Sequence, residues 1–234
     1  ASNDGYLQDK FAEFGLKLLG IEPTSIAANI SKSKGHRVIK NFFGLNFSKE
    51  LVKKKGKFDL IIANNVLAHV PDINDFILGI KNCLSRKGVI TIENPSIVNL
   101  IEKNQFDTIY HEHFSYLSLT SVEFIAKKNM LEIFDVEECK IHGGSIRYFL
   151  QHLKAGQNKI SERVKKLKDL EYSKGYKKIK TYKKFSEKCK QTKVDFLKFI
   201  FLQISKGKKI AAYGAAAKGN TFLNYCGLKK DTIQ

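Results

Sequence analysis

The sequence contains little that would place it outside the class of ordinary globular proteins. Its 234 residues include only three prolines, and its glycines follow no repeat, which argues against a low-complexity chain. No stretch approaches the roughly 18–20 consecutive apolar residues of a membrane span. The first residues also lack the basic and then apolar pattern of a signal segment. We therefore expect a cytoplasmic protein without a membrane partner.

Cysteine is also scarce. The four cysteines are Cys83, Cys139, Cys189 and Cys226, and no two of them form a CxxC pair. This spacing predicts reduced thiols that are mostly packed in the interior. The hydrophobic content of 43% supports a core, and 234 residues suffice for one domain and part of another.

Positive charge is in excess, with a net charge of +18. Most of it lies in residues 154–209, which hold 19 Lys and Arg against five Asp and Glu. A lysine-rich run of this kind is typical of a solvated helix face. A nucleic-acid surface is the alternative, and its binding would weaken steeply with salt. Nucleic acid is not expected as a partner.

Alternating apolar patterns predict an α/β fold. Helices are predicted over residues 6–14, 24–33, around 49–55 and 119–128. A further helix is predicted from the cap at Asp72 or Asn74 to residue 84. Strands are predicted over residues 19–22, 38–39, 58–63, 89–92, 131–136 and 145–150. The continuous apolar run 58–63 predicts a buried parallel strand, and Asp72 or Asn74 is expected to cap the helix that follows it. The last two strands predict an antiparallel hairpin added to a doubly wound sheet.

The C-terminal third predicts two further parts. Residues 154–206 are helical and charged, whereas residues 209–221 predict a strand, a turn of small residues and the start of a helix. Small residues let backbone N–H groups approach a phosphate, and Lys218 adds charge. The alternative is a plain strand–helix corner. We expect one α/β domain at 1–152, a basic helical segment at 153–206, and the start of another α/β domain at 207–234.

A glycine turn opens the chain and precedes a helix. The next predicted strand ends in Glu22, which lies 17 residues after Gly5. In a nucleotide-binding βαβ unit, a glycine-rich turn is followed about 20 residues later by an acid that binds ribose hydroxyls. No strand precedes this turn, which indicates a chain that starts inside a domain.

Residues 110–116 (YHEHFSY) combine two imidazoles, one carboxylate and two phenols. They follow a predicted strand that ends in ENP, and strand ends open onto ligand crevices in α/β proteins. The stretch therefore favours a catalytic loop. A polar loop with inward-packed aromatics is the alternative. A metal site of His111, Glu112 and His113 is a further alternative that rests on HxH spacing alone.

Seven motifs together resemble one family. They are SNDG, GIEP, FDLIIANNVLAHVPD, ENPS, YHEHFSYLSL, HGGSIRY and KIAAYGAAAKGNT. The series resembles the S-adenosylmethionine-dependent sugar-nucleotide C-methyltransferases of deoxysugar and antibiotic-sugar pathways. That family implies a zinc-binding N-terminal domain, a class I methyltransferase domain and a Rossmann-like C-terminal domain. Relative to it, this chain lacks the zinc domain, the first methyltransferase strand and most of the last domain. Ala1 also stands where the family has glycine, and no zinc or other metal is expected here.

The resemblance implies a role for each of several residues. The cofactor S-adenosylmethionine would contact Asn3, Asp4, Gly5, Glu22, Asn64 and Asn65. The catalytic group would be His113 as general base, with Tyr110, Glu112 and His69 around it. The nucleotide-sugar substrate would contact Gly143, Gly144, Ser145, Arg147, Lys218 and Asn220.

The chemistry that the resemblance implies explains these residue types. A carbon beside a ketone must lose a proton before it can attack a methyl sulfonium, and imidazole has a suitable pKa of about 6.5. Tyr110 or His69 can donate to the enolate oxygen, and Glu112 can orient an imidazole. A small-molecule O- or N-methyltransferase is the alternative, but it does not account for the phosphate-binding turn.

Overall fold

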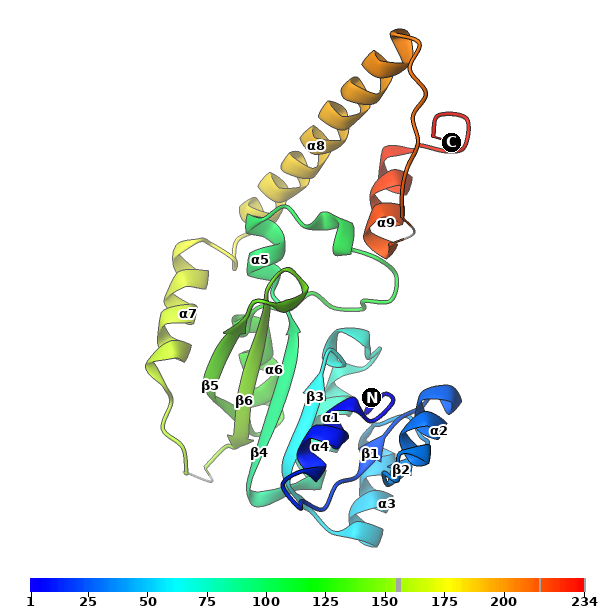
Figure 1. The fold of residues 1–234 in the computed structure, drawn as a ribbon. Coiled ribbons are helices and arrows are strands. Elements are labelled where there is room, and N and C mark those ends of the chain that lie inside the picture. Colours follow the sequence, from blue (N-terminus) through cyan, green and yellow to red (C-terminus); the bar gives the residue numbers. More distant parts are fainter. Residues whose placement is uncertain (155–156, 215, 234) are drawn as a thin grey trace.

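The computed structural model describes residues 1–154, 157–214 and 216–233. Within these residues the strands form two sheets (Figure 1). The smaller sheet pairs β1 (Gly20–Ile21) with β2 (Val38–Ile39) in parallel. The larger sheet has the order β3-β4-β6-β5.

The larger sheet combines parallel and antiparallel pairs. Strand β3 (Phe58–Asn64) runs parallel to β4 (Leu84–Pro95). Strand β6 (Ser145–His152) is antiparallel to both β4 and β5 (Leu131–Cys139). The predicted mixed α/β architecture with an antiparallel hairpin is therefore confirmed.

Helices were predicted correctly at five places in the first two thirds of the chain, whereas the helix at 97–102 was not predicted. The described residues contain nine α-helices. They are α1 (Tyr6–Ala12), α2 (Ser25–Ser33), α3 (Leu45–Lys55), α4 (Ile73–Cys83), α5 (Ile97–Glu102), α6 (Leu119–Lys128), α7 (Glu162–Ser173), α8 (Ile179–Ser205) and α9 (Ala217–Cys226). The short 3₁₀ helices are η1 (Leu67–His69), η2 (Phe106–Thr108) and η3 (Ile141–Gly143). The cap of α4 is Asp72, whose carboxylate accepts from the N–H groups of Asn74 and Asp75 at 3.0 Å.

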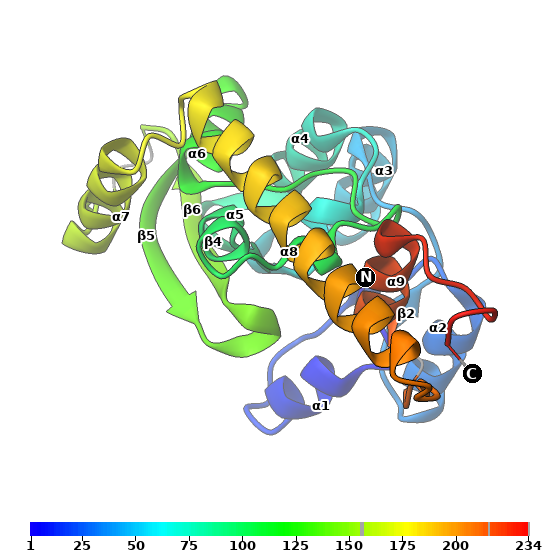
Figure 2. The ribbon, with the colours of Figure 1, turned by 90° about the horizontal axis from the view of Figure 1, so that it is seen from above.

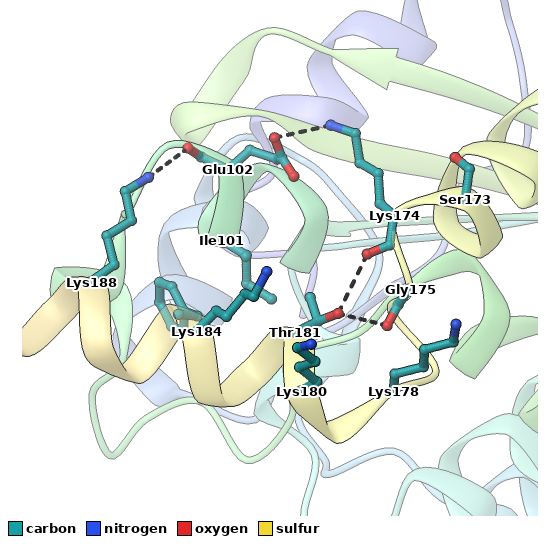
Figure 3. A pocket seen from close by; sticks show the side chains of 11 residues that line it. Ile101, Glu102, Ser173, Lys174, Gly175, Lys178, Lys180, Thr181, Lys184 and Lys188 are labelled. Carbon is teal, nitrogen blue, oxygen red and sulfur yellow. Dashed lines mark hydrogen bonds and ion pairs between the residues drawn. The ribbon is translucent and has the colours of Figure 1, made fainter.

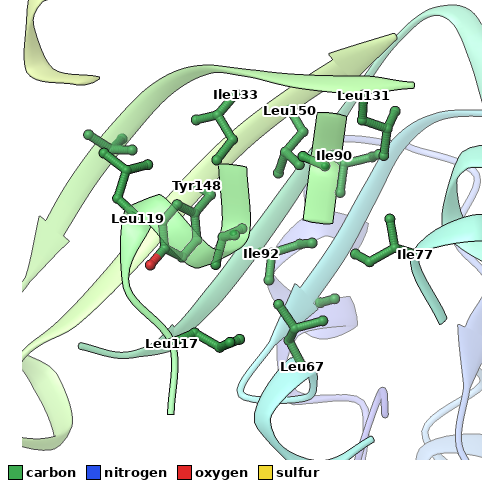
Figure 4. Close-up of a cluster of buried hydrophobic side chains, with 14 of the residues drawn as sticks. Leu67, Ile77, Ile90, Ile92, Leu117, Leu119, Leu131, Ile133, Tyr148 and Leu150 are labelled. Atoms are coloured by element: carbon green, nitrogen blue, oxygen red, sulfur yellow. The ribbon is translucent and has the colours of Figure 1, made fainter. Parts of the chain in front are cut away.

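The core lies between one face of the larger sheet and helices α4, α6 and α7 (Figure 4). The alternate residues Ile90 and Ile92 of β4 point into it, as do Tyr148 and Leu150 of β6, and all four side chains are fully buried. Burying an aliphatic side chain of this size contributes about 1.5–3 kcal/mol. The same period of two leaves polar residues on the opposite face of β4.

One strand is less buried than its apolar run predicts. Leu60 of β3 is 45% exposed, although Ala63 of the same strand is buried. The predicted parallel pairing is confirmed, whereas the predicted burial is confirmed only for the face that carries Ile61 and Ala63. Strand β3 lies at the edge of the larger sheet, and only its face toward α4 joins the core.

The C-terminal elements extend away from the sheet. Helix α8 projects from the body, and α9 lies beside it (Figures 1 and 2), where Ile200, Cys226 and Leu228 form a small buried cluster. No helix among the described residues combines the length and the apolar composition that a membrane span requires.

The strand predicted over residues 209–213 was wrong. Residues 208–214 form neither helix nor strand, and residues 211–214 are exposed. A strand needs a neighbour to satisfy its backbone groups, and no described strand pairs with this segment. The predicted helix start is confirmed at Ala217, while Ala215 of the small-residue turn lies outside the described residues.

Candidate functional site

Two loops carry the residues predicted to be catalytic, and backbone hydrogen bonds to one carbonyl group connect these loops. The 3₁₀ helix η1 follows β3 and ends in His69, while His113 lies in the loop between η2 and α6. The carbonyl oxygen of Ala68 accepts from the N–H groups of Phe114 at 2.8 Å and Ser115 at 3.3 Å. The two loops are thereby held in contact although more than 40 residues separate them along the chain.

His113 lies at the centre of a cluster of rings. Its ring centroid is 4.6 Å from that of His69, 4.6 Å from that of Tyr110 and 5.6 Å from that of Tyr116. His69 and Tyr116 meet it edge-on, and Tyr110 is tilted by 32°. We call these four side chains the ring cluster.

The ring cluster lines a cavity of about 200 Å³. The lining residues come from five parts of the chain and are Asn65, His69, Pro95, Ser96, Leu100, Gln105, Thr108, Tyr110, His113, Tyr116, Gly144 and Lys218. The cavity therefore brings together predicted cofactor, catalytic and substrate residues. Six lining residues were not among the predicted site residues. They are Pro95, Ser96, Leu100, Gln105, Thr108 and Tyr116, of which Pro95, Ser96 and Tyr116 lie in the ENPS and YHEHFSYLSL motifs.

The pKa of His113 lies below its ordinary value. Burial of the ring is the main cause, and the electrostatic effect of the neighbouring His69 imidazole acts in the same direction. A backbone hydrogen bond with Thr108 and the charge of Glu112 oppose the shift but do not cancel it. The imidazole of His113 is therefore neutral at neutral pH and can accept a proton.

Tyr116 supports the loop that carries this imidazole. Its hydroxyl donates to the carbonyl oxygens of Thr108 at 3.3 Å and Tyr110 at 3.4 Å. Burial raises the pKa of the phenol, so Tyr116 stays protonated. A protonated phenol can keep donating to both carbonyls.

Two residues of the same motif lie outside the cavity. Glu112 and His111 are exposed, and neither lines the cavity. Across residues 1–154, 157–214 and 216–233, no three His, Cys, Asp or Glu side chains are grouped as a metal site requires.

The predicted cofactor turn has a tight left-handed backbone. Gly5 has φ of +85°, and a Cβ atom there would lie 2.5 Å from Ser31 Oγ and 2.6 Å from His36 Cδ2. Only glycine fits this position without displacing its neighbours. The carbonyl of Gly5 accepts from Asp9 N at 2.9 Å, and Asp4 Oδ1 accepts from Tyr6 N at 3.2 Å, so the turn continues directly into α1.

Glu22 connects this turn to the end of β1. The residue is only 3% exposed, and its carboxylate accepts from Asn3 N at 2.8 Å, Thr24 N at 3.0 Å and Thr24 Oγ1 at 2.7 Å. Burial alone would raise the pKa of Glu22, but these hydrogen bonds outweigh it and lower the pKa. Glu22 is therefore an ionised group that holds the turn at Asn3 in place.

The two asparagines after β3 differ in their surroundings. Asn64 is exposed, whereas Asn65 lines the cavity. The backbone of Asn65 is left-handed, with φ of +53°, and its N–H donates to the Glu93 carbonyl at 2.7 Å. Its side-chain oxygen is buried and has no hydrogen-bond partner among the described residues. An unpaired buried acceptor of this kind suits a ligand donor.

The predicted substrate residues of the hairpin serve mainly to hold β6 in place. Ser145 is fully buried and donates to Glu93 Oε1 at 2.9 Å, and Arg147 donates to Glu93 Oε2 at 2.7 Å and to Glu137 at 2.9 Å. Gly144 lines the cavity with φ of +116°.

The remaining substrate residues flank the cavity. The carbonyl of Gly143 accepts from Lys103 Nζ at 3.0 Å. Lys218 reaches the cavity because α9 packs on η2, where Phe106 lies 5.8 Å from Phe222 and 5.3 Å from Tyr225. Asn220 is exposed and does not line the cavity.

Comparison with known proteins gives one relative along the whole chain. The chain is 30% identical over 233 residues to the C-methyltransferase NovU of Streptomyces niveus, covering 100% of this chain and 55% of NovU. It thus spans about half the length of that relative.

Solved structures share the fold. A SAM-dependent methyltransferase of Anabaena variabilis has a TM-score of 0.54 at 11% identity, over 65% of this chain and 74% of that one. An S-adenosylmethionine-dependent methyltransferase of Clostridium acetobutylicum has a TM-score of 0.51 at 14% identity, over 65% of this chain and 81% of that one. At these identities the likeness shows the fold alone, which is the class I methyltransferase fold.

Two protein families match successive parts of the chain. Residues 140–234 match the family described as the C-methyltransferase C-terminal domain. Residues 2–135 match the family described as the methyltransferase domain. Because the second match spans more than half of the chain and agrees with the observed fold, this chain belongs to the methyltransferase-domain family.

Proposed function

We propose that the protein is an S-adenosylmethionine-dependent C-methyltransferase that acts on a nucleotide-linked keto-deoxysugar. The observation that carries the proposal is the neutral imidazole of His113, which lies in the ring cluster and lines the cavity. The similarity to a C-methyltransferase along the whole chain supports the reaction type. The sugar-nucleotide substrate rests on the motif resemblance and on Lys218 at the cavity.

The residues on the cofactor side suit S-adenosylmethionine, whose sulfonium supplies an electrophilic methyl group. The turn at Asn3, Asp4 and Gly5 leads directly into α1, and its residues would contact the cofactor. Ionised Glu22 keeps acceptor capacity for ribose hydroxyls beside its bonds to Asn3 and Thr24. The unpaired oxygen of Asn65 would accept from an ammonium or hydroxyl group, and exposed Asn64 would contact the ligand from the rim.

His113 would act as the general base. Its burial keeps it unprotonated, and the rings around it fix its orientation. It would take the proton from the substrate carbon beside the ketone, leaving an enolate whose carbon attacks the methyl group. Tyr110 and His69 would donate to the enolate oxygen. Exposed Glu112 would act only through its charge, which stabilises the protonated form of His113 after proton transfer.

The substrate would enter from the side of α9. Lys218 would contact a phosphate, and Gly144 would let the sugar approach the backbone closely. Asn220 would contribute as an exposed residue of α9 and Gly143 as the neighbour of Gly144. Ser145 and Arg147 would act indirectly, by holding β6 in place through Glu93. In this proposal residues 1–152 bind the cofactor, residues 153–206 form a helical spacer, and residues 207–234 contribute to nucleotide binding.

The reaction type can be tested directly by mass spectrometry. We expect the full-length protein with S-adenosylmethionine to raise the mass of a nucleotide-linked keto-sugar by about 14 Da, the net gain when a methyl group replaces a hydrogen. The methyl group should be bonded to carbon. A methyl group found on oxygen or nitrogen would instead establish the O- or N-methyltransferase alternative. No transfer to any member of a keto-sugar nucleotide panel would contradict the proposed substrate.

Glu22 gives a second test through cofactor affinity. We expect Glu22→Gln to weaken S-adenosylmethionine binding by about 1–3 kcal/mol in calorimetry, because an amide cannot accept all the hydrogen bonds that the carboxylate accepts. Glu50→Gln on α3 is the matched control, since Glu50 is an exposed acid. Equal affinities for the Glu22 variant and the control would count against the cofactor assignment.

The titration of His113 gives a third test. In NMR we expect its midpoint below about 6.5, because burial and the electrostatic effect of the His69 imidazole both disfavour the proton. The unfolded chain binds this proton more tightly, so the contribution of His113 to stability is present above about pH 6.5 and is lost as the pH falls through the lowered value. The variant His69→Gln removes the electrostatic effect of this imidazole on His113 and should therefore raise the midpoint of His113. The control His152→Gln, at the opposite end of β6, should leave it unchanged, and a midpoint above 6.5 in the wild type would refute the neutral base.

A further inference from the structure

A second cavity lies on the outer side of α5, between this helix, the α7–α8 turn and the first half of α8 (Figure 3). Its volume is about 410 Å³. It is lined by Ile101, Glu102, Ser173, Lys174, Gly175, Lys178, Lys180, Thr181, Lys184, Phe185 and Lys188. We call it the lysine groove.

The charge of the lysine groove is strongly unbalanced, with five lysines against one carboxylate. That carboxylate, Glu102, is already engaged, since it accepts from Lys174 at 2.9 Å and from the hydroxyl of Tyr176 at 2.9 Å. Lys188 donates to the backbone carbonyl of Glu102 at 3.4 Å. Four cations of the groove thus lack an acidic partner among the described residues, namely Lys178, Lys180, Lys184 and Lys188.

The lysines are arranged on one face of a long helix. Lys180, Lys184 and Lys188 are spaced by four residues, so they form a single row along α8 of about 12 Å. Lys178 stands at the N-cap of α8, which has no side-chain cap. The N–H groups of this helix end add positive potential to the groove. Like charges at this spacing repel one another, and a bound anion would remove that cost.

The geometry points to a binding site for the di- or triphosphate group of a small molecule in the lysine groove. Lysine ammonium groups bind phosphate as mobile point charges, so several of them can converge on one phosphate chain. A concave site of this volume falls in the range of small-ligand pockets, which are about 300–1,000 Å³.

The lysine groove is separate from the cavity that holds the ring cluster. Helix α5 lies between them, because Leu100 lines the catalytic cavity whereas Ile101 and Glu102 line the groove. Anion binding in the groove should therefore be independent of the proposed reaction. Anion binding in the groove should also persist in Glu22→Gln, because this variant is expected to weaken only the binding of S-adenosylmethionine.

The test is calorimetry of the full-length protein with inorganic tripolyphosphate at about 0.15 M salt. We expect Lys180→Gln/Lys184→Gln to weaken binding at least tenfold. The matched control is Lys49→Gln/Lys53→Gln on α3, which removes two exposed lysines at the same spacing and should change affinity less than twofold. Circular dichroism would confirm that both variants fold.

Three results would overturn the proposal. The first is the absence of tripolyphosphate binding by the wild type. The second is equal weakening by the two double variants, which would show attraction by net charge alone. The third is tighter binding of a single-stranded RNA oligonucleotide that both variants weaken, which would make the lysines part of a nucleic-acid surface.

Discussion

The candidate site depends on two hydrogen bonds that the carbonyl oxygen of Ala68 accepts. This oxygen accepts from two successive N–H groups, those of Phe114 and Ser115, and so fixes the loop after β3 against the loop that carries His113. Without this junction the rings of His69 and His113 would not be held 4.6 Å apart. The burial of His113 and its proximity to His69, which together lower its pKa, both occur beside this junction.

A second constraint comes from the sheet. Asn64, Glu93, Arg147 and Glu137 form one row across all four strands of the larger sheet. Glu93 is buried at the centre of this row, where it accepts from Ser145 and Arg147 while its carbonyl accepts from Asn65 N. The row therefore fixes the antiparallel hairpin and the left-handed Asn65 at the same end of the sheet, which is the end that opens onto the cavity.

Sequence patterns were sufficient for the elements whose signals are local. The cap of α4, the apolar periods and the hairpin of β5 and β6 were predicted from local patterns. A catalytic loop at residues 110–116 was also predicted. The strand over 209–213 was wrong because strand formation depends on a neighbour, which no local pattern reveals. The structural role of Ser145 was likewise invisible, since it depends on Glu93, 52 residues away. The sequence predicted a solvated helix face for the lysines of the groove. The groove itself could not be predicted, because it also needs α5, which is distant in the sequence from α8.

The most direct test of the central claim is solvent deuterium exchange at the substrate carbon beside the ketone. It would be measured in the presence of the demethylated cofactor, so that proton removal is observed without methyl transfer. The role of His113 predicts exchange in the wild-type protein and in His111→Ala, and a loss of about 10²–10⁴-fold in His113→Ala with little change in cofactor affinity. Exchange at the wild-type rate in His113→Ala would contradict the assignment of His113 as the base.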